Sequence, residues 1–193
     1  MAKLYFKFGT MNSSKTANAL MTKFNYEEKG KKVWLIKPSI DTRDGANIIK
    51  SRIGLQAVAD VISPTDDLLE LCPLDDIDVV IADEAQFLTG AQVDQLRLIV
   101  SEHDIPVLCF GLRTDFTTHL FEGSRRLMEL ADSITEIKSI CKCGAKSTVN
   151  ARIDSQGRVV TSGAQIVIGG NEAYESMCWS CWHKMVMENQ NNN

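Results

Sequence analysis

The sequence lacks several features that would place it in a large class of proteins. It has no apolar run close to the roughly 18 consecutive residues of a membrane-spanning helix, so we expect no association with a membrane. Residues 4–8 are apolar but are interrupted by Lys7 and followed by polar residues, a pattern that does not fit a secretory signal. An excess of positive charge is also missing, because 21 basic and 25 acidic residues leave a net charge of −4. This mild acidity disfavours a function in binding the nucleic-acid backbone, and we expect no nucleic-acid partner.

Cysteine is scarce over most of the chain. Before residue 140 the only cysteines are Cys72 and Cys109, which stand in apolar surroundings typical of buried core thiols. A secreted disulfide framework would spread its cysteines through the chain, so we expect a cytoplasmic protein with free thiols. A content of 44% hydrophobic and 24% charged residues in 193 positions is typical of one globular domain, or of one domain with a small appendage.

Short apolar runs alternate with helical patterns as far as residue 140. This alternation predicts an α/β domain with a mostly parallel sheet flanked by helices. Ser63, Pro64 and Thr65 have the pattern of a helix start, and Thr89 begins a capping-box pattern. The polar residues 39–54 predict a long mobile loop. The expected strands are 4–8, 33–36, 79–82, 106–110 and 133–138, and the expected helices are 16–29, 89–102 and 124–131.

The pattern changes after residue 140. Residues 154–157 predict a hairpin turn between strands at 148–153 and 158–161. A further strand is expected at 165–168, and a helix at 180–188. We therefore predict an α/β domain at 1–140, a small C-terminal lobe at 141–188 and a disordered polar tail at 189–193.

The junction between the first strand and the first helix carries a phosphate-loop signal. Its sequence is GTMNSSKT, which matches G-x-x-x-x-G-K-[ST] except that Ser14 replaces the second glycine. In such loops main-chain amides cradle phosphate oxygens at a helix N-terminus. The lysine, here Lys15, reaches the β- and γ-phosphates, and the next hydroxyl, here Thr16, holds Mg²⁺. The alternative is a Ser/Thr-rich turn with a chance Lys-Thr pair. The expected nucleotide ligands are Gly9, Thr10, Met11, Asn12, Ser13, Ser14, Lys15 and Thr16.

The apolar strand at 79–82 ends in two carboxylates, Asp83 and Glu84. In phosphate-loop proteins an Asp at the end of a neighbouring strand holds the Mg²⁺ shell. An adjacent Glu can take a proton from water or from a substrate hydroxyl. Acidic loop residues after a strand are common, but their occurrence together with the loop predicts nucleotide-phosphate chemistry of the P-loop NTPase kind. Asp83, Glu84, Ala85 and Gln86 complete the expected nucleotide-binding set.

The other four cysteines form two tight pairs. Cys141 and Cys143 make C-x-C, and Cys178 and Cys181 make C-x-x-C. Four thiolates satisfy tetrahedral zinc in a closed site with no open position for catalysis. Buried free cysteines or a redox pair are the alternatives. We expect a structural zinc site that ties the hairpin region at 150–175 to the main domain, because about 50 residues make too small a core alone.

Several other residues leave two interpretations open. Three aromatic side chains after predicted strands either stack on a planar ligand or pack in the core. Gly169 and Gly170 either form a turn before Tyr174 or expose backbone for the close approach of a ligand. Arg43 either stabilises the charge of a transferring phosphoryl group or is a solvated surface arginine. The three aromatic residues are Phe87, Phe116 and Phe121.

Together these segments resemble the zinc-containing thymidine kinases over nearly the whole chain. The stretches 110–116 and 167–170 are specific to that family, and the C-x-C pair resembles its bacterial branch. Ser14 departs from the family's usual glycine. The other matching residues are 9–16, Lys37, Pro38, Asp41, Thr42, Arg43, 83–87, Phe121, Gly123, Ser124, Tyr174 and the four paired cysteines.

The resemblance implies ATP-dependent phosphorylation of the 5′-hydroxyl of thymidine, and also of deoxyuridine. It implies that Glu84 acts as the base, that Lys15 and Arg43 assist catalysis, and that Thr16 and Asp83 organise Mg²⁺. A segment at about 163–174 would close over the nucleoside and exclude water. A homotetramer and feedback inhibition by thymidine triphosphate are further implications. The implied thymidine-binding residues are Met11, Phe87, Leu112, Phe116, Phe121, Val167, Ile168, Gly169, Gly170 and Tyr174.

Two other functions compete with this interpretation. A small zinc-ribbon ATPase acting on nucleic acid would use Glu84 to activate water, and it predicts a basic stripe on the surface. A non-catalytic nucleotide-binding adaptor is the other alternative, which the presence of both Lys15 and Glu84 disfavours.

Overall fold

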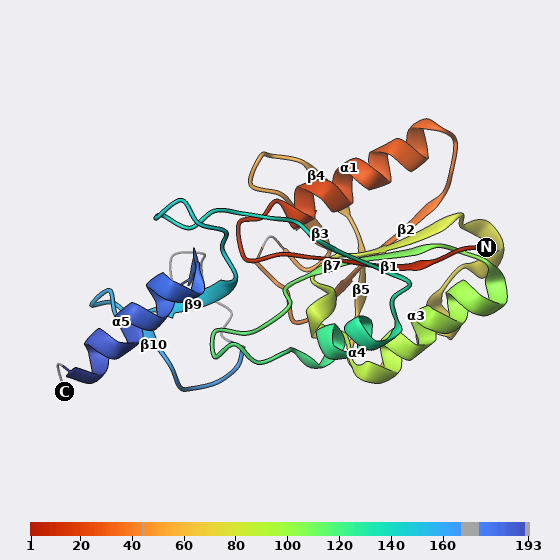
Figure 1. The fold of residues 1–193 in the computed structure, drawn as a ribbon. Coiled ribbons are helices and arrows are strands. Elements are labelled where there is room, and N and C mark those ends of the chain that lie inside the picture. The colour runs from red at the N-terminus through yellow and green to blue at the C-terminus, as the bar shows by residue number, and fades with distance from the viewer. Residues whose placement is uncertain (44, 167–173, 192–193) are drawn as a thin grey trace.

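A six-stranded parallel sheet forms the centre of the main domain (Figure 1). The computed structural model describes residues 1–43, 45–166 and 174–191. Every strand pair in this sheet is parallel, which confirms the predicted fold class. In spatial order the strands are β5 (Asp60–Ile62), β2 (Val33–Pro38), β6 (Val79–Ala82), β7 (Val107–Gly111), β1 (Leu4–Phe8) and β8 (Ser133–Glu136).

Helices cover both faces of the sheet, which explains why its central strands are apolar throughout. Every residue of β6 and β7 is buried, as expected for strands between two helix layers. The helix α1 (Lys15–Glu28) packs on one face through Ala19 and Leu20, and α3 (Gly90–His103) and α4 (Glu122–Leu130) cover the other (Figure 1). The short connecting helices are α2 (Leu68–Leu71), η1 (Leu74–Asp76) and η2 (Ala85–Phe87).

The two predicted helix starts have different outcomes. The capping box of α3 is confirmed, because the Thr89 and Gln92 side chains each accept a hydrogen bond from the main chain of the other residue. The predicted start at Ser63 is wrong. Residues 63–66 form a turn closed by the Asp66 side chain, and α2 begins after Asp67, whose carboxylate accepts hydrogen bonds from two main-chain amides of the helix.

The segment predicted as a long loop contains a hairpin. Strand β3 (Ile48–Lys50) pairs antiparallel with β4 (Gln56–Val58). Strand β2 also continues to Pro38 instead of ending at residue 36. A proline fits there because the pairing with β6 ends at Ile36, so the missing N–H removes no hydrogen bond on that side.

A smaller antiparallel sheet forms the C-terminal lobe, with β9 (Val149–Ile153) between β10 (Val159–Val160) and β11 (Tyr174–Met177). The hairpin turn at 154–157 is confirmed. The predicted strand at 165–168 is wrong for its described residues Gln165 and Ile166, and residues 167–168 lie outside the described part. Helix α5 (Trp179–Asn191) includes residues 189–191, which were expected in the disordered tail. No helix in the described ranges is long and apolar enough to cross a membrane.

Candidate active site

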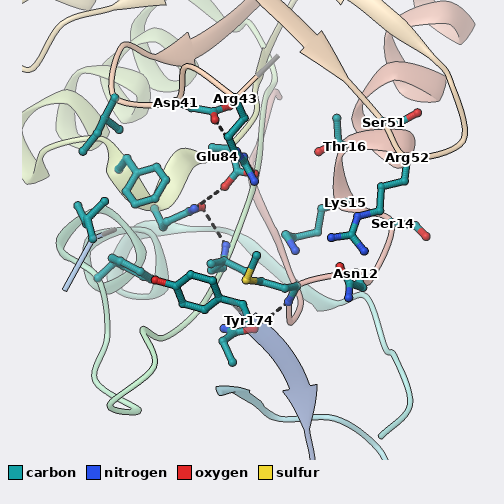
Figure 2. Close-up of a pocket in the computed structure, with 18 of the residues that line it drawn as sticks. Asn12, Ser14, Lys15, Thr16, Asp41, Arg43, Ser51, Arg52, Glu84 and Tyr174 are labelled. Atoms are coloured by element: carbon teal, nitrogen blue, oxygen red, sulfur yellow. Dashed lines mark hydrogen bonds and ion pairs between the residues drawn. The ribbon is translucent and has the colours of Figure 1, made fainter. Parts of the chain in front are cut away.

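A cavity of about 630 Å³ lies at the carboxyl ends of the parallel strands, beside the C-terminal lobe (Figure 2). This edge is where open parallel sheets bind ligands. The cavity brings together predicted site residues that are far apart in the sequence: Met11, Asn12, Ser14, Lys15, Thr16, Arg43, Glu84, Gln86, Phe87, Leu112, Phe116, Phe121 and Tyr174.

Other predicted site residues do not line the cavity or lie outside the described structure. Those that are buried behind its wall are Gly9, Thr10, Ser13, Asp83 and Ala85. The predicted nucleoside-binding residues Val167, Ile168, Gly169 and Gly170 lie outside the described residues.

The phosphate loop connects β1 to α1 in a tightly turned conformation. Asn12 and Ser14 both have left-handed backbone, with φ of 67° and 63°. At Gly9 a Cβ would lie 2.3 Å from Ser13 Oγ and 2.4 Å from the carbonyl oxygen of Ile137, so only glycine fits. Ser14 therefore adopts the turn that the phosphate-loop pattern assigns to glycine, with a strain of about 1 kcal/mol that a glycine would not carry.

Lys15 begins α1 inside this loop. Its ammonium donates hydrogen bonds to the carbonyl oxygen of Thr10 at 2.7 Å and to Ser13 Oγ at 3.4 Å. Burial lowers the pKa of Lys15 to about 8, although the carboxylates of Glu84 and Asp83 act in the opposite direction. An anion bound in the loop would favour the charged ammonium, because it would supply the counter-charge that burial makes necessary.

Asp83 and Glu84 follow β6, and Glu84 lines the cavity whereas Asp83 is buried behind its wall. Asp83 is only 4% exposed. Burial and repulsion from Glu84 raise the pKa of Asp83, while a hydrogen bond with Thr16 lowers it. A carboxyl group beside a hydroxyl in this position has the oxygen ligands that Mg²⁺ prefers, so Thr16 and Asp83 fit the predicted metal-binding pair.

Arg43 lines the cavity, where two ion pairs hold its guanidinium, although the residue is also exposed to solvent. Its guanidinium donates to Glu84 Oε1 at 2.5 Å and to Asp41 Oδ1 at 2.6 Å (Figure 2). Both carboxylates raise the pKa of Arg43, which stays charged. Gln86 Nε2 donates to Glu84 Oε2 at 2.5 Å, so both oxygens of the Glu84 carboxylate are held in place. The sequence suggested neither this ion pair nor the role of Gln86 as a partner of Glu84.

The aromatic residues serve both as core and as cavity wall. Phe116 and Phe121 are 1% and 5% exposed, yet both line the cavity. Phe87 packs edge-on against Phe121, with ring centroids 5.5 Å apart. The two interpretations of these residues are therefore compatible, because a flat apolar wall must be packed from behind to keep its shape.

Arg152 on β9 supports this wall, although the sequence analysis did not single it out. Its guanidinium lies 3.6 Å from the centroid of the Phe116 ring and donates to Tyr174 Oη at 2.7 and 3.0 Å. It thereby connects two residues implied to bind the nucleoside. The only available signal was a charged residue in a predicted strand, which by itself indicates no role.

The β3–β4 hairpin contributes a further basic side chain to the cavity. Figure 2 shows Arg52 directed toward Lys15 and Asn12. Its positive charge contributes to the lowered pKa of Lys15. Sequence reasoning missed Arg52 because it assigned residues 39–54, which include β3 and Arg52, to a mobile loop. Other cavity residues that it missed are Lys50, Ser51, Ile53, Thr114, Asp115, Asn150 and Gln165.

The four paired cysteines form one cluster in the C-terminal lobe. Their sulfur atoms all lie within 4.8 Å of one another, and Cys143 Sγ is 3.6 Å from Cys178 Sγ. Main-chain N–H groups of Cys143 and Cys178 lower the pKa of the Cys141 thiol, which favours the thiolate form that binds metal. A single cluster of four thiols fits a closed tetrahedral metal site better than two separate redox pairs. Cys72 and Cys109 are buried free thiols, as predicted.

The parallel sheet, the phosphate loop and the facing acidic pair define a nucleotide-binding α/β protein of the P-loop class. The family described as thymidine kinase matches residues 2–182. The chain therefore belongs to the thymidine kinase family, and it is an ATP-dependent kinase. The alternative of a nucleic-acid-dependent ATPase is not favoured.

Relatives support this assignment over nearly the full length. A thymidine kinase from Ruegeria pomeroyi is 45% identical over 188 residues, covering 95% of each chain. One from Shewanella oneidensis is 44% identical and covers 92% of this chain and 95% of its own. Among solved structures, a Pif1 helicase from Candida albicans covers 72% of this chain and 36% of its own, with a TM-score of 0.43 and 14% identity. That structural likeness is too low to carry an argument.

Proposed function

We propose that Glu84 takes the proton from the 5′-hydroxyl of thymidine while that oxygen attacks the γ-phosphorus of ATP. The bond from the γ-phosphorus to the bridging oxygen breaks, and the products are thymidine monophosphate and ADP. One observation carries the proposal: Glu84 and Lys15 line the same cavity, so a hydroxyl beside the carboxylate would face phosphates held by the loop. A positioned base is expected to contribute about 10²–10⁴-fold to the rate.

The donor phosphates would bind to residues 9–16, with the Lys15 ammonium and the loop amides as ligands. Arg52, beside Lys15, would add a second positive charge. Thr16 and Asp83 would hold Mg²⁺, which neutralises phosphate charge when bound. Ala85 and Gln86 complete the nucleotide side of the site, and the hydrogen bond from Gln86 keeps the Glu84 carboxylate oriented toward the cavity.

Arg43 has two tasks in this proposal. Its ion pair would fix the position of the Glu84 carboxylate that accepts the proton. Its guanidinium also lies within the cavity wall, where it can bind oxygens of the transferring phosphoryl group. Asp41 orients the guanidinium from the opposite side, and Lys37 holds Asp41 in turn at 3.5 Å.

The nucleoside would bind against the aromatic side of the cavity. Met11, Leu112 and Tyr174 line this part together with the three phenylalanines. We propose that residues 163–174, including Val167, Ile168, Gly169 and Gly170, close over the base, and that deoxyuridine is accepted as well as thymidine. Closure would exclude water, so that the phosphoryl group goes to the sugar hydroxyl.

The remaining assignments follow from family membership and are proposals of the same kind. The cysteine cluster would hold a structural zinc ion, since four thiols match its ligand preference. Free, clustered thiols are typical of a reducing compartment, which supports a cytoplasmic location. We also propose a homotetramer and inhibition by thymidine triphosphate, and we retain the boundaries near residues 140 and 188 as predictions.

The proposed reaction is tested by incubating the purified chain with ATP, Mg²⁺ and single nucleosides. Thymidine and deoxyuridine are expected to give monophosphates, whereas deoxycytidine and adenosine are not. A parallel assay measures ATP hydrolysis with single-stranded DNA or RNA and no nucleoside. Hydrolysis stimulated by nucleic acid, without any nucleoside monophosphate, would contradict the proposal.

A further inference from the structure

Two side chains of the C-terminal lobe hold the main chain of the phosphate loop. The N–H of Met11 donates to Asn150 Oδ1 at 2.8 Å. The carbonyl oxygen of Met11 accepts a hydrogen bond from Ser176 Oγ. The main-chain N–H and carbonyl of Met11 are therefore both bound by side chains of the C-terminal lobe. These side chains lie 139 and 165 positions away in the sequence.

The positions of Asn150 and Ser176 are linked by the register of the small sheet. Asn150 on β9 is directly opposite Ser176 on β11. Residues opposite each other in an antiparallel pair project from the same face of a sheet, so the two side chains reach Met11 side by side. Asn150 is 3% exposed and Ser176 is 9% exposed.

The two faces of this small sheet have different partners. Alternate residues of β9 and β11 place Arg152 and Tyr174 on the same face as Asn150 and Ser176. That polar face lies against the loop and the cavity. The opposite face presents Ala151 and Met177, which pack with the cysteine cluster in a separate apolar core. The small sheet therefore lies between the cysteine cluster and the phosphate loop.

Asn150 also connects the loop to a third segment. Its Nδ2 donates to the carbonyl oxygen of Thr114 at 2.9 Å, in the segment after β7. The buried side-chain amide of Asn150 thus connects Met11 to the segment that carries Leu112 and Phe116. These two residues line the nucleoside side of the cavity.

The loop needs such a restraint because of its own backbone. Asn12, which follows Met11, and Ser14 both have positive φ, a conformation that persists only where the surroundings enforce it. We propose that Asn150 and Ser176 are positioning residues that hold the phosphate loop in its anion-binding conformation. The C-terminal lobe is then part of the donor site as well as a cover for the nucleoside. This inference rests on the proposed donor site at residues 9–16.

The test compares Ser176→Ala with Ser176→Thr, which keeps the hydroxyl, and with Ser155→Ala in the exposed turn of the same lobe. The dissociation constant of ADP is measured by calorimetry, together with KM for ATP and kcat. Ser176→Ala is expected to weaken ADP binding about 5- to 10-fold, the size expected for one lost hydrogen bond, and to raise KM for ATP more than it lowers kcat. Ser176→Thr and Ser155→Ala are expected to stay within about 2-fold of the unmodified chain.

Hydrogen exchange supplies a readout that does not depend on activity. In Ser176→Ala, amides of residues 9–16 are expected to exchange faster, while those of β7 remain unchanged. Asn150→Ala is expected to show the same pattern with a larger effect, since it frees both Met11 and Thr114. If Asn150→Ala does not fold, Ser176→Ala still decides the question.

The outcomes separate this inference from the donor site itself. If the unmodified chain binds ADP and Ser176→Ala binds it equally well with unchanged loop exchange, Asn150 and Ser176 do not position the loop. A lower melting temperature with unchanged ADP affinity would also overturn the inference, because it would show a purely structural role. If the unmodified chain does not bind ADP, the proposed donor site fails, and the inference fails with it.

Discussion

Arg43 Nη2 lies 2.5 Å from Glu84 Oε1, so the residue proposed as the base is paired with the residue proposed to bind the transferring phosphoryl group. The two residues come from the segments that follow β2 and β6, after Pro38 and after Ala82. This relationship fixes the position of the Glu84 carboxylate, because the guanidinium holds one of its two oxygens. It also predicts that the two residues act as a unit.

Replacement of Glu84 by glutamine should separate binding from catalysis. Glu84→Gln keeps the shape of the side chain but cannot accept the hydroxyl proton, so kcat for thymidine is expected to fall about 10²–10⁴-fold. ADP affinity, measured by calorimetry, should change much less. Glu102→Gln on the exposed surface of α3 is the matched control. An unchanged kcat in Glu84→Gln would refute the assignment of the base.

The affinity for ADP should depend on pH through Lys15. The pKa of Lys15 is lowered to about 8, and bound phosphates require the charged form. Above pH 8 the free protein must take up a proton to bind ADP, so the affinity for ADP is expected to fall as the pH rises. Well above pH 8 the fall approaches about 10-fold per pH unit. Calorimetry between pH 7 and 9 in buffers of different ionisation enthalpy measures this uptake. Lys15→Arg, which remains charged, should lose the dependence, and an equal slope in both proteins would contradict the prediction.

The guanidinium of Arg152 should be needed for nucleoside binding. Arg152→Met removes the contact with the Phe116 ring and the hydrogen bonds to Tyr174, and KM for thymidine is expected to rise about 10- to 100-fold. ADP binding should change little, because these contacts lie on the nucleoside side of the cavity. Arg158→Met, directly after the exposed turn of the same lobe, is the control. Equal effects on thymidine and ADP would indicate general loosening of the lobe instead.

The cysteine cluster should bind about one zinc ion per chain, measured by elemental analysis. Cys143→Ser is expected to abolish most of this binding, and hydrogen exchange in β9 and α5 should rise before exchange in β1 and β7. Cys72→Ser removes a buried thiol outside the cluster and should retain the metal. Absence of zinc from the unmodified chain, purified without chelator, would end the prediction.

The parts of the fold that the sequence predicted are those set by local patterns. The apolar strands, the capping box at Thr89 and the strand–loop–helix junction each depend on a few adjacent residues. The errors have an equally local cause. At Ser63 the sequence matches a helix start, but Asp66 closes a turn there and Asp67 provides a competing cap. Strands β3 and β4 have only three residues each, so their hydrophobic pattern is too short to indicate strands.

By itself, the sequence determined which chemical groups this protein has and where each lies along the chain: a phosphate loop, an acidic pair after a strand, and two cysteine pairs. Only the tertiary structure decided which of them act on one another. Arg43 pairs with Glu84, which lies 41 positions away in the sequence. Met11 is hydrogen-bonded to Asn150 and Ser176, which lie 139 and 165 positions away. Hydrophobic periodicity shows which face of an element is buried, but the partner of that face depends on how all the layers pack together.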